Sequence, residues 1–476
     1  MSDPGPLPDA TRQQPQGLRI AIVGAGPAGI RAAETLVRHG LRPTVIDEAP
    51  RSGGQIYRRP PADVGFTRSA VSLYGFEARK AQSLHRAFDA LQDRLDYRPG
   101  TLVWDIAEGH LHGHRYETGT GFRLAYDALL LATGAMDRVI PIPGWTLPGV
   151  FTLGGAQIAL KYQGCAIGRR TILLGSGPLL YLVAHQYAKA GAAVAGVLDT
   201  APASAKRRAL PTLLASPAQL AKGLLYRAAL AARGVAIHEG VRPLRIEETR
   251  QQLALHFRDA AGRARWLDGD AVALGWGLRS ETQLADLAGC RFGFDRLDRQ
   301  WLPETDSEGR SSVPGLYLAG DGAGIAGADA AERRGELAAL ALLADRGFGV
   351  PPARMAALRA NLEEIRRFRK RLEAAFPFPD ELAAAVADDT LLCRCEAITA
   401  GVLRASIGGL AAGELNRAKA WSRVGMGRCQ GRVCGSAAAE VLAAALGLPV
   451  EAVGRLRGQP PVKPIPVSAL RTEETA

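Results

Sequence analysis

The sequence predicts an α/β fold with two Rossmann-like domains, the second inserted in the first, followed by a small C-terminal helical domain. Residues 18–47 read as a strand, a Gly-rich turn, a helix and a second strand that ends in an acid, and residues 171–199 repeat that order. Residues 313–321 form a further apolar run, which ends in Gly-Asp and would return the chain to the first domain. Strands that alternate with helical segments in this way indicate parallel sheets.

The turn of the first unit is Gly24-x-Gly26-x-x-Gly29. In such a turn the first glycine permits the bend, the second lets the backbone approach a pyrophosphate, and the third lets the helix pack closely on the strand. The phosphates would lie at the helix N-terminus, where free N–H groups and the helix dipole favour negative charge. An acid after the second strand stands where a ribose binds. We therefore expect a dinucleotide to be bound by Gly24, Gly26, Pro27, Ala28, Gly29, Asp47 and Glu48.

Composition and charge exclude several classes of protein. The length of 476 residues suits about three domains. The formal net charge of +12 comes mostly from arginines scattered along an Ala-rich chain rather than from a basic run, so we expect no nucleic-acid partner. No apolar stretch is as long as the roughly 18 residues of a membrane span, and the Pro-rich residues 1–17 do not read as a secretory signal. We expect a cytoplasmic protein with a disordered N-terminal tail.

Two further segments indicate a flat ligand beside the first turn. Paired glycines at 53 and 54 let the backbone run close to such a ligand, and Gln55 can both donate and accept a hydrogen bond. An apolar run at 128–132 then ends in Thr133-Gly134. At this point the chain resembles the two-dinucleotide-domain flavoproteins of the thioredoxin and glutathione reductase type, in which such a turn closes over FAD before the chain enters the inserted domain. The resemblance implies FAD contacts from Gly54, Gln55, Val103, Ala132, Thr133 and Gly134.

The third flavin segment is Val313-Pro-Gly-Leu-Tyr-Leu-Ala-Gly-Asp321. In the resembled family Gly320 and Asp321 lie at the flavin, where the acid hydrogen-bonds the ribityl chain. A helix from about Asp329 would aim its N-terminus at the flavin ring and stabilise its reduced anion. The redox Cys-x-x-Cys of the thiol–disulfide reductases is absent from this part of the sequence, and we interpret the isolated Cys165 and Cys290 as buried structural residues.

The second unit departs from the pattern at one position. Gly175 and Gly177 keep the first two glycines, whereas Leu180 replaces the third and should displace the helix or force it to repack. Asp199, at the ribose position, would favour NAD over NADP, but whether NAD(P) binds is left open. The long stretch 200–234 should add helical turns. These turns could cover the nicotinamide position, dock a partner subunit, or simply elaborate the domain.

Four cysteines cluster in the C-terminal part, as Cys393-Arg-Cys395 and Cys429-Gln-Gly-Arg-Val-Cys434. Four thiolates suit either an iron–sulfur cluster or a structural zinc ion, with free thiols as a third possibility. A flavin that accepts electron pairs needs a one-electron outlet, which favours [2Fe–2S] over zinc. Nearby glycines would present N–H groups to sulfur, and Arg428 and Arg432 would offset the charge of the cluster. The segment GMGRCQGRVCG resembles the [2Fe–2S] module of bacterioferritin-associated ferredoxin.

The whole order of segments resembles one narrower family, the FAD and [2Fe–2S] subunits of bacterial heteromeric amine or amino-acid dehydrogenases. Octopine and nopaline oxidases, hydrogen cyanide synthase, and proline and hydroxyproline dehydrogenases belong to it. The resemblance implies an electron-transfer subunit without catalytic side chains of its own. It also implies a second flavoprotein subunit like glycine or sarcosine oxidase, and it allows a small ferredoxin-like subunit and FMN at the interface between subunits. Two alternatives are a self-sufficient NAD(P)H-dependent oxidoreductase and a structural scaffold subunit.

The motifs divide the chain into segments. We expect a disordered tail at 1–17, an FAD-binding domain at 18–150 and 291–348, an inserted NAD(P)-binding-like domain at 151–290, a helical linker at 349–387, a [2Fe–2S]-binding domain at 388–450 and a Pro-rich tail at 451–476.

Overall fold

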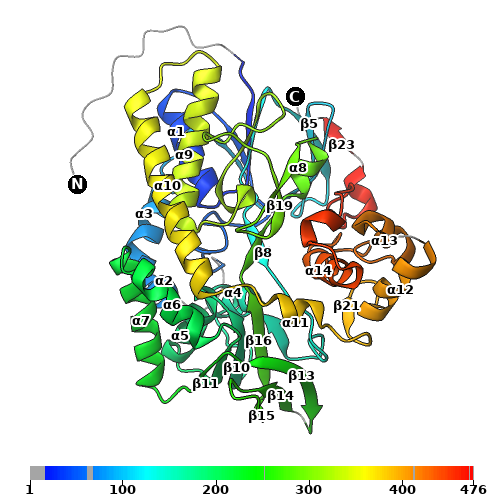
Figure 1. Cartoon of the computed structure of the whole chain (residues 1–476). Coiled ribbons are helices and arrows are strands. Elements are labelled where there is room, and N and C mark those ends of the chain that lie inside the picture. The colour runs from blue at the N-terminus through cyan, green and yellow to red at the C-terminus, as the bar shows by residue number, and fades with distance from the viewer. Residues whose placement is uncertain (1–16, 62–67, 251, 411–412, 471, 475–476) are drawn as a thin grey trace.

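The computed structural model describes residues 17–61, 68–250, 252–410, 413–470 and 472–474. The tail predicted at 1–17 lies outside the described residues except for Gly17. Figure 1 shows an upper α/β region, a lower α/β region and, at the right, a helical region formed by the orange and red part of the chain.

The upper region is built on a parallel sheet. Its strands in spatial order are β20 (Leu316–Leu318), β7 (Ala128–Leu131), β1 (Ile20–Val23), β2 (Thr44–Ile46) and β3 (Asp96–Arg98). Val23 pairs with Ile46 and with Leu131, and Leu131 pairs with Leu318. Each of these is the last residue of its strand, so four carboxyl ends reach one edge of the sheet, which is the ligand-binding edge of α/β proteins.

Two helices cover one face of this sheet and pack closely against each other. They are α1 (Pro27–Arg38) and α9 (Ala328–Asp345), and α9 begins one residue before the predicted start. A Cβ added at Gly335 of α9 would lie 2.0 Å from the carbonyl oxygen of Ala28. Shorter helices complete this side, namely α2 (Ala70–Tyr74) and α3 (Ala78–Asp89). The other face packs against α8 (Gln283–Leu287) and the antiparallel strands β4 (Thr101–Ala107), β5 (His110–Arg115) and β6 (Gly121–Ala125).

The lower region contains a second parallel sheet. Its strands in spatial order are β12 (Ile237–Glu239), β11 (Ala193–Asp199), β10 (Arg170–Ser176), β16 (Ala271–Trp276) and β9 (Val150–Thr152). An antiparallel sheet lies beside it, formed by β13 (Arg242–Thr249), β14 (Gln252–Arg258) and β15 (Ala264–Gly269). Its helices are α4 (Leu153–Ile158), α5 (Pro178–Lys189), α6 (Ala203–Leu213) and α7 (Pro217–Ala231), of which α6 and α7 are the helical turns expected after Asp199.

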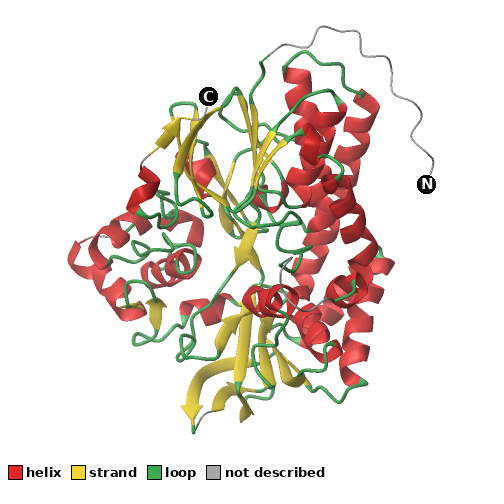
Figure 2. Cartoon of the chain, turned by 180° about the vertical axis from the view of Figure 1, so that it is seen from behind, coloured by secondary structure: helices red, strands yellow, loops and turns green. Residues whose placement is uncertain are grey.

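The two regions are joined by a narrow two-stranded ribbon. Strand β8 (Ala135–Asp137) leaves the upper region and pairs antiparallel with β17 (Leu278–Ser280), which returns to it. A hairpin of β18 (Phe292–Asp295) and β19 (Gln300–Pro303) follows. Figure 2 shows the ribbon between the two sheets. This topology is that of an FAD- and NAD-dependent oxidoreductase fold, with one dinucleotide unit inserted in the other.

The helical region follows a long helix, α10 (Pro352–Ala375), which packs on α9 and α6. Figure 2 shows the long helices along one side of the two sheets and the C-terminal helices on the opposite side. The C-terminal elements are α11 (Asp380–Ala384), β21 (Leu391–Cys393), β22 (Ile398–Thr399), α12 (Ala400–Leu410), α13 (Leu415–Ser422) and α14 (Gly435–Leu446).

Residues 455–470 and 472–474, which we call the return segment, run back from the helical region to the upper region. The Val462 amide donates to the carbonyl of Trp104 at 3.0 Å, and Lys463 pairs with Glu48. Strand β23 (Thr472–Glu474) adds a parallel strand beside β6. A side chain at Gly121 would collide with the Ala469 carbonyl, 1.9 Å from the added Cβ. The sequence indicated only a Pro-rich tail here, so this pairing was not predicted.

One prediction about the isolated cysteines is wrong. Cys290 is buried as expected, but Cys165 is exposed. It lies in the loop that follows the π-helical turn Ala159–Gln163, and its sulfur is 3.9 Å from the Ala159 carbonyl oxygen. Among the described residues, no helix is long and apolar enough to cross a membrane.

Candidate functional site

The first glycine turn leaves no room for a side chain at its first and third glycines. A Cβ at Gly24 would lie 2.3 Å from the Ala132 carbonyl oxygen, and one at Gly29 would lie 1.8 Å from the Gly24 carbonyl oxygen. A Cβ at Gly54 would lie 2.9 Å from the Cα of Gly26, so the two Gly-rich loops touch. Gly26 also caps α1 without a side-chain hydrogen bond, which leaves amides of the first helical turn free for an anion. We call Gly24, Gly26, Gly29 and Gly54 the first cradle.

The acid of the first unit is held by the backbone. Asp47 accepts hydrogen bonds from the amides of Ala25 at 2.5 Å and Ala49 at 2.7 Å. Burial raises the pKa of Asp47 although these amides oppose the shift. The neighbouring Glu48 is exposed and accepts from the Tyr116 hydroxyl at 3.0 Å. Val103, another expected contact residue, is buried in β4.

The segments expected at the flavin ring meet near the ribbon. The Gln55 amide donates to the Ala135 carbonyl at 3.0 Å, which ties the first cradle to β8. Asp321 accepts hydrogen bonds from the amides of Ala326 and Gly327 at 2.9 and 3.0 Å, just before α9 begins. A Cβ at Gly322 would lie 2.6 Å from the Thr133 hydroxyl, so the second and third flavin segments are in contact.

The second unit keeps the turn but encloses its acid. A Cβ at Gly175 would lie 1.8 Å from the Gly275 carbonyl oxygen, and Leu180 is fully buried in the core of the lower region. The helix therefore repacks around Leu180, one of the two outcomes expected. Asp199, also fully buried, accepts from the Tyr181 hydroxyl at 2.7 Å and from the Ala201 amide at 2.8 Å, and it pairs with Lys206.

The helices after Asp199 supply the groups that enclose it. Lys206 of α6 also pairs with Glu239 at 2.6 Å, and Arg227 of α7 pairs with Glu239 at 2.5 Å. We call Tyr181, Asp199, Lys206, Arg227 and Glu239 the Asp199 cluster. Burial alone would raise the pKa of Glu239, but hydrogen bonds from Arg227 and Lys206 lower it to about 2. The acid that the sequence suggested for a ribose is thus bound by other groups of the chain itself.

The four C-terminal thiols lie together in a row. Hydrogen bonds join Cys393 to Cys434, Cys434 to Cys429 and Cys429 to Cys395. Hydrogen bonding with Cys434 lowers the pKa of Cys393 to about 6 and that of Cys429 to about 5, and these two contacts raise the pKa of Cys434 well above its usual value. Amides of residues 395, 396, 425, 431 and 433 donate to these sulfurs.

As they stand, the thiols do not form a closed ligand set. Within the described ranges, no group of three or more His, Cys, Asp or Glu side chains is arranged to hold a metal ion. Cys393 and Cys434 are buried, whereas Cys395 and Cys429 are partly accessible. Arg428 is exposed, and Arg432 is paired with Glu281 at 2.6 Å, so its charge is already compensated.

Residues 279–283 connect two segments, which we call the flavin turn (Thr133-Gly134) and the thiol loop (residues 429–434). No sequence motif indicated residues 279–283. At the flavin turn, the Glu281 carbonyl accepts from the Thr133 hydroxyl at 2.6 Å, and its amide donates to the Gly134 carbonyl at 2.9 Å. At the thiol loop, the Glu281 carboxylate binds Arg432, and the Gln283 amide donates to the Gln430 carbonyl at 2.6 Å. Arg279 donates to the Arg432 carbonyl at 2.8 Å. The only feature of the sequence that could have pointed to residues 279–283 is that they follow the buried strand at 271–276.

Comparisons with known proteins agree with this architecture. The family model of "Pyridine nucleotide-disulphide oxidoreductase" matches residues 18–341. An opine oxidase subunit of Rhizobium meliloti is 38% identical over 473 residues, which cover 95% of this chain and 86% of the relative. Hydrogen cyanide synthase subunit HcnB of Pseudomonas aeruginosa is 35% identical, covering 95% of this chain and 98% of the relative. The crystal structure of L-proline dehydrogenase from P. horikoshii has a TM-score of 0.66 at 19% identity, covering 94% of this chain and 78% of that one, which shows a shared fold.

Proposed function

Because the chain belongs to the pyridine nucleotide-disulphide oxidoreductase family, and within it to the relatives of these opine oxidase and hydrogen cyanide synthase subunits, we propose that it is the FAD- and [2Fe–2S]-containing electron-transfer subunit of a heteromeric amine or amino-acid dehydrogenase. The family itself supports a flavin-dependent oxidoreductase that is related to subunits of heteromeric oxidases. The cluster, the relay of electrons and the substrate class are the proposal.

The first cradle fits FAD in the way the family requires. Four glycines bring the backbone close to the carboxyl edge of the upper sheet. No side chain caps the first turn of α1, so its amides can bind a pyrophosphate. Asp47 stands at the ribose position. Gln55, Thr133 and Asp321 would border the flavin ring. When bound, FAD supplies two-electron chemistry and an iron–sulfur cluster supplies one-electron transfer, while the protein contributes position and field.

The donor set of the C-terminal thiols fits [2Fe–2S]. Cys393, Cys395, Cys429 and Cys434 would be its ligands, since four thiolates are the usual shell of such a cluster. Backbone amides donate hydrogen bonds to the sulfurs, and hydrogen bonds of this kind stabilise bound clusters. Zinc would accept the same four sulfurs, so metal analysis has to separate the two.

The observation that carries the proposal is the direct link through Glu281. Its backbone holds both residues of the Thr133-Gly134 turn, and its side chain holds Arg432, between Cys429 and Cys434. This short bonded path joins the Thr133-Gly134 turn to the loop between Cys429 and Cys434 within one chain. Such a path suits a relay of electrons from the flavin to the cluster.

The partner would oxidise the substrate. The described part of this chain has no evident nucleophile and base arranged for chemistry on an amine, and the relatives named above are themselves subunits. We propose a second flavoprotein subunit of the glycine or sarcosine oxidase type as the electron source. A small ferredoxin-like subunit and interface FMN belong to the same proposal, as does a cytoplasmic location.

The Asp199 cluster weighs against the self-sufficient NAD(P)H-dependent alternative. NAD would have to displace Lys206 and Tyr181 from Asp199 to reach the acid with its ribose. Breaking a buried ion pair costs about 3–5 kcal/mol, which would have to come from the affinity for the nucleotide. We therefore propose that electrons do not enter through the lower region.

The test is to assay oxidation of opines and secondary amines by the chain alone and with its co-purifying subunit. We expect turnover only in the complex, with about two iron atoms per chain. Robust turnover by the chain alone, or zinc as the only metal, would contradict the proposal. Cys429→Ser should abolish turnover of the complex, whereas a scaffold subunit would tolerate this change.

The path through Glu281 has its own matched test. Glu281→Gln should slow electron transfer from the reduced flavin to the cluster by about tenfold in stopped-flow spectra, with flavin and iron contents unchanged. Glu440→Gln is the control, because the Glu440 carboxylate is about as buried as that of Glu281 and binds Arg299 of the β18–β19 hairpin, but it touches neither turn. Equal rates in the two variants would remove Glu281 from the path.

A further inference from the structure

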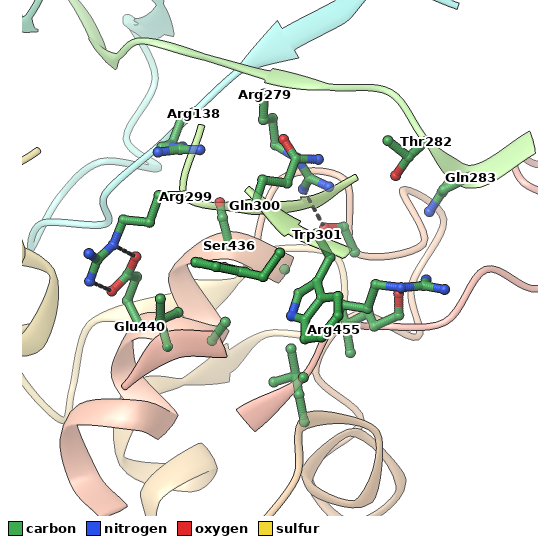
Figure 3. Close-up of a pocket in the computed structure, with 18 of the residues that line it drawn as sticks. Arg138, Arg279, Thr282, Gln283, Arg299, Gln300, Trp301, Ser436, Glu440 and Arg455 are labelled. Carbon is green, nitrogen blue, oxygen red and sulfur yellow. Dashed lines mark hydrogen bonds and ion pairs between the residues drawn. The ribbon is translucent and has the colours of Figure 1, made fainter. Parts of the chain in front are cut away.

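A cavity lies between the ribbon, the β18–β19 hairpin and helix α14. Its volume is about 80 Å³, which is room for several water molecules or for the acid group of a ligand. None of the four glycines of the first cradle and none of the four C-terminal cysteines lines it. Figure 3 shows Arg138 and Arg279 on one side of the cavity, and Ser436 and Glu440 on α14 on the opposite side.

Positive charge exceeds negative charge in this cavity. Its four arginines face two carboxylates, and both carboxylates are already engaged. Arg299 binds Glu440 through two hydrogen bonds of 2.6 and 2.9 Å, and Arg455 binds Asp286 through two of 2.6 and 2.8 Å. Arg138 and Arg279 are thus left without an ion pair among the described residues.

These two arginines are also poorly solvated. The residue Arg138 is only 7% exposed, and burial lowers its pKa to about 10. Burial lowers the pKa of Arg279 as well. Each guanidinium donates to backbone carbonyls, Arg138 to that of Asp298 and Arg279 to those of Gly431 and Arg432. The carboxylates that act on them electrostatically, Asp298 and Glu440 on Arg138 and Glu281 on Arg279, form their ion pairs with other arginines. Burying a cation without an ion-pair partner is costly, so an anion in the cavity would stabilise both guanidinium groups.

Unpartnered donors line the same space. The Nε atoms of Arg138 and Arg279, the indole Nε1 of Trp301 and the hydroxyl of Ser436 are buried and have no hydrogen-bond partner among the described residues. Buried polar atoms are nearly always paired, so four unpaired donors around one cavity indicate a missing acceptor. Ser436 lies in the first turn of the twelve-residue helix α14, whose dipole favours an anion there. An unpaired acceptor in the lining, Oε1 of Gln283, suits a hydroxyl on the ligand.

We propose that this cavity binds a small oxyanion, the phosphate or carboxylate group of a ligand, between Arg138, Arg279 and the N-terminus of α14. The anion accepts hydrogen bonds from the two Nε atoms, from Trp301 and from Ser436. None of the expected cofactor ligands lines the cavity, but Gln430 and Gly431, which lie between Cys429 and Cys434, do. The cavity lies between the ribbon and the thiol loop, so a bound anion can act on the ribbon and on the thiol loop.

The test is a calorimetric titration of the full-length chain with inorganic phosphate and, separately, with acetate, at constant ionic strength. We expect saturable binding at one site for at least one of them, and an unfolding temperature that rises with the concentration of that anion. Tighter binding of phosphate would identify a phosphate group as the ligand, and tighter binding of acetate a carboxylate. Absence of saturable binding by either anion would overturn the proposal.

Substitutions locate the site. Arg138→Met and Arg279→Met should each weaken anion binding by about tenfold or more, since each removes a charged donor. Arg334→Met is the matched control: Arg334 is half-buried and donates to the carbonyls of Gly320 and Gly324, but it does not line the cavity. Trp301→Phe and Ser436→Ala remove a donor without removing charge, so they test the site even if an arginine variant fails to fold. Affinity equal to wild type in these two variants and in every arginine variant that folds would overturn the proposal.

Discussion

The two dinucleotide units have the same strand, turn, helix and strand, yet they treat the acid at the end of the second strand in opposite ways. Asp47 of the upper unit accepts hydrogen bonds from the amides of Ala25 and Ala49, whereas Asp199 of the lower unit is bound by Tyr181 and Lys206. The difference arises outside the turn itself, because helix α6 delivers Lys206. A dinucleotide fold can therefore persist after the chain has occupied its ligand-binding groups.

The largest expected effect is on the third glycine of the upper unit. Gly29→Ala would place a Cβ 1.8 Å from a backbone oxygen that cannot move away, so α1 would have to leave the sheet. We expect a loss of more than about 4 kcal/mol of unfolding free energy and no bound flavin, measured by urea denaturation and absorbance. Gly26→Ala is the contrast: its Cβ would meet only the Cα of Gly54, at 3.6 Å, so the fold should survive while flavin is lost. Flavin retained at full affinity in Gly26→Ala would contradict the cradle.

The next effect is on the enclosed acid. Asp199→Ala removes one partner of a buried ion pair and should cost about 3–5 kcal/mol of unfolding free energy. Flavin content should stay unchanged, because Asp199 belongs to the lower unit. Asp47→Ala is the counterpart and should act mainly on flavin affinity. If both variants lost flavin alike, the two acids would not have separate roles.

Leu180→Ala tests the position where the two turns differ. Leu180 is fully buried, so truncation should leave a cavity and cost about 3 kcal/mol. The variant should gain no affinity for NADH, because Lys206 and Tyr181 still occupy Asp199. Calorimetric titration with NADH checks this, and tight binding would show that Leu180 alone excludes the nucleotide.

A smaller effect concerns pH. The pKa of Glu239 is about 2 in the folded chain and near 4.5 in the unfolded chain, so its ion pairs stabilise the fold fully above about pH 5. This contribution should disappear as the pH falls from about 4.5 toward 2. We expect the difference in unfolding free energy between wild type and Glu239→Gln to shrink by about 1–2 kcal/mol from pH 6 to pH 3, after allowance for solvent screening. A difference independent of pH would show that Glu239 does not titrate in this way.

The last prediction is that NADH has no effect on the flavin. Anaerobic NADH should leave the flavin of the wild-type chain oxidised over minutes, as followed by its visible absorbance, because we propose that the Asp199 cluster excludes the nucleotide. Reduction by dithionite in the same cuvette controls for an accessible flavin. Rapid bleaching by NADH would restore the NAD(P)H-dependent alternative.

The sequence predicted the parts of the fold that local patterns determine. The alternation of apolar runs and glycine turns predicts both dinucleotide units, because each needs a bend and a close helix at known spacing. The enclosure of Asp199 could not be predicted, since Lys206 and Arg227 meet it only through the folding of α6 and α7. Arg138 and Arg279 were missed for the same reason: each lies in or beside a short strand with no motif, and its partners come from distant parts of the chain. Whether the predicted domain boundaries and ligand roles hold stays a prediction.

The return segment has a consequence for how the protein is made. Strand β6 and Glu48 leave the ribosome hundreds of residues before β23 and Lys463, with which they pair in the folded chain. During synthesis the upper region is therefore an open sheet with an unpaired edge, which invites association with other chains.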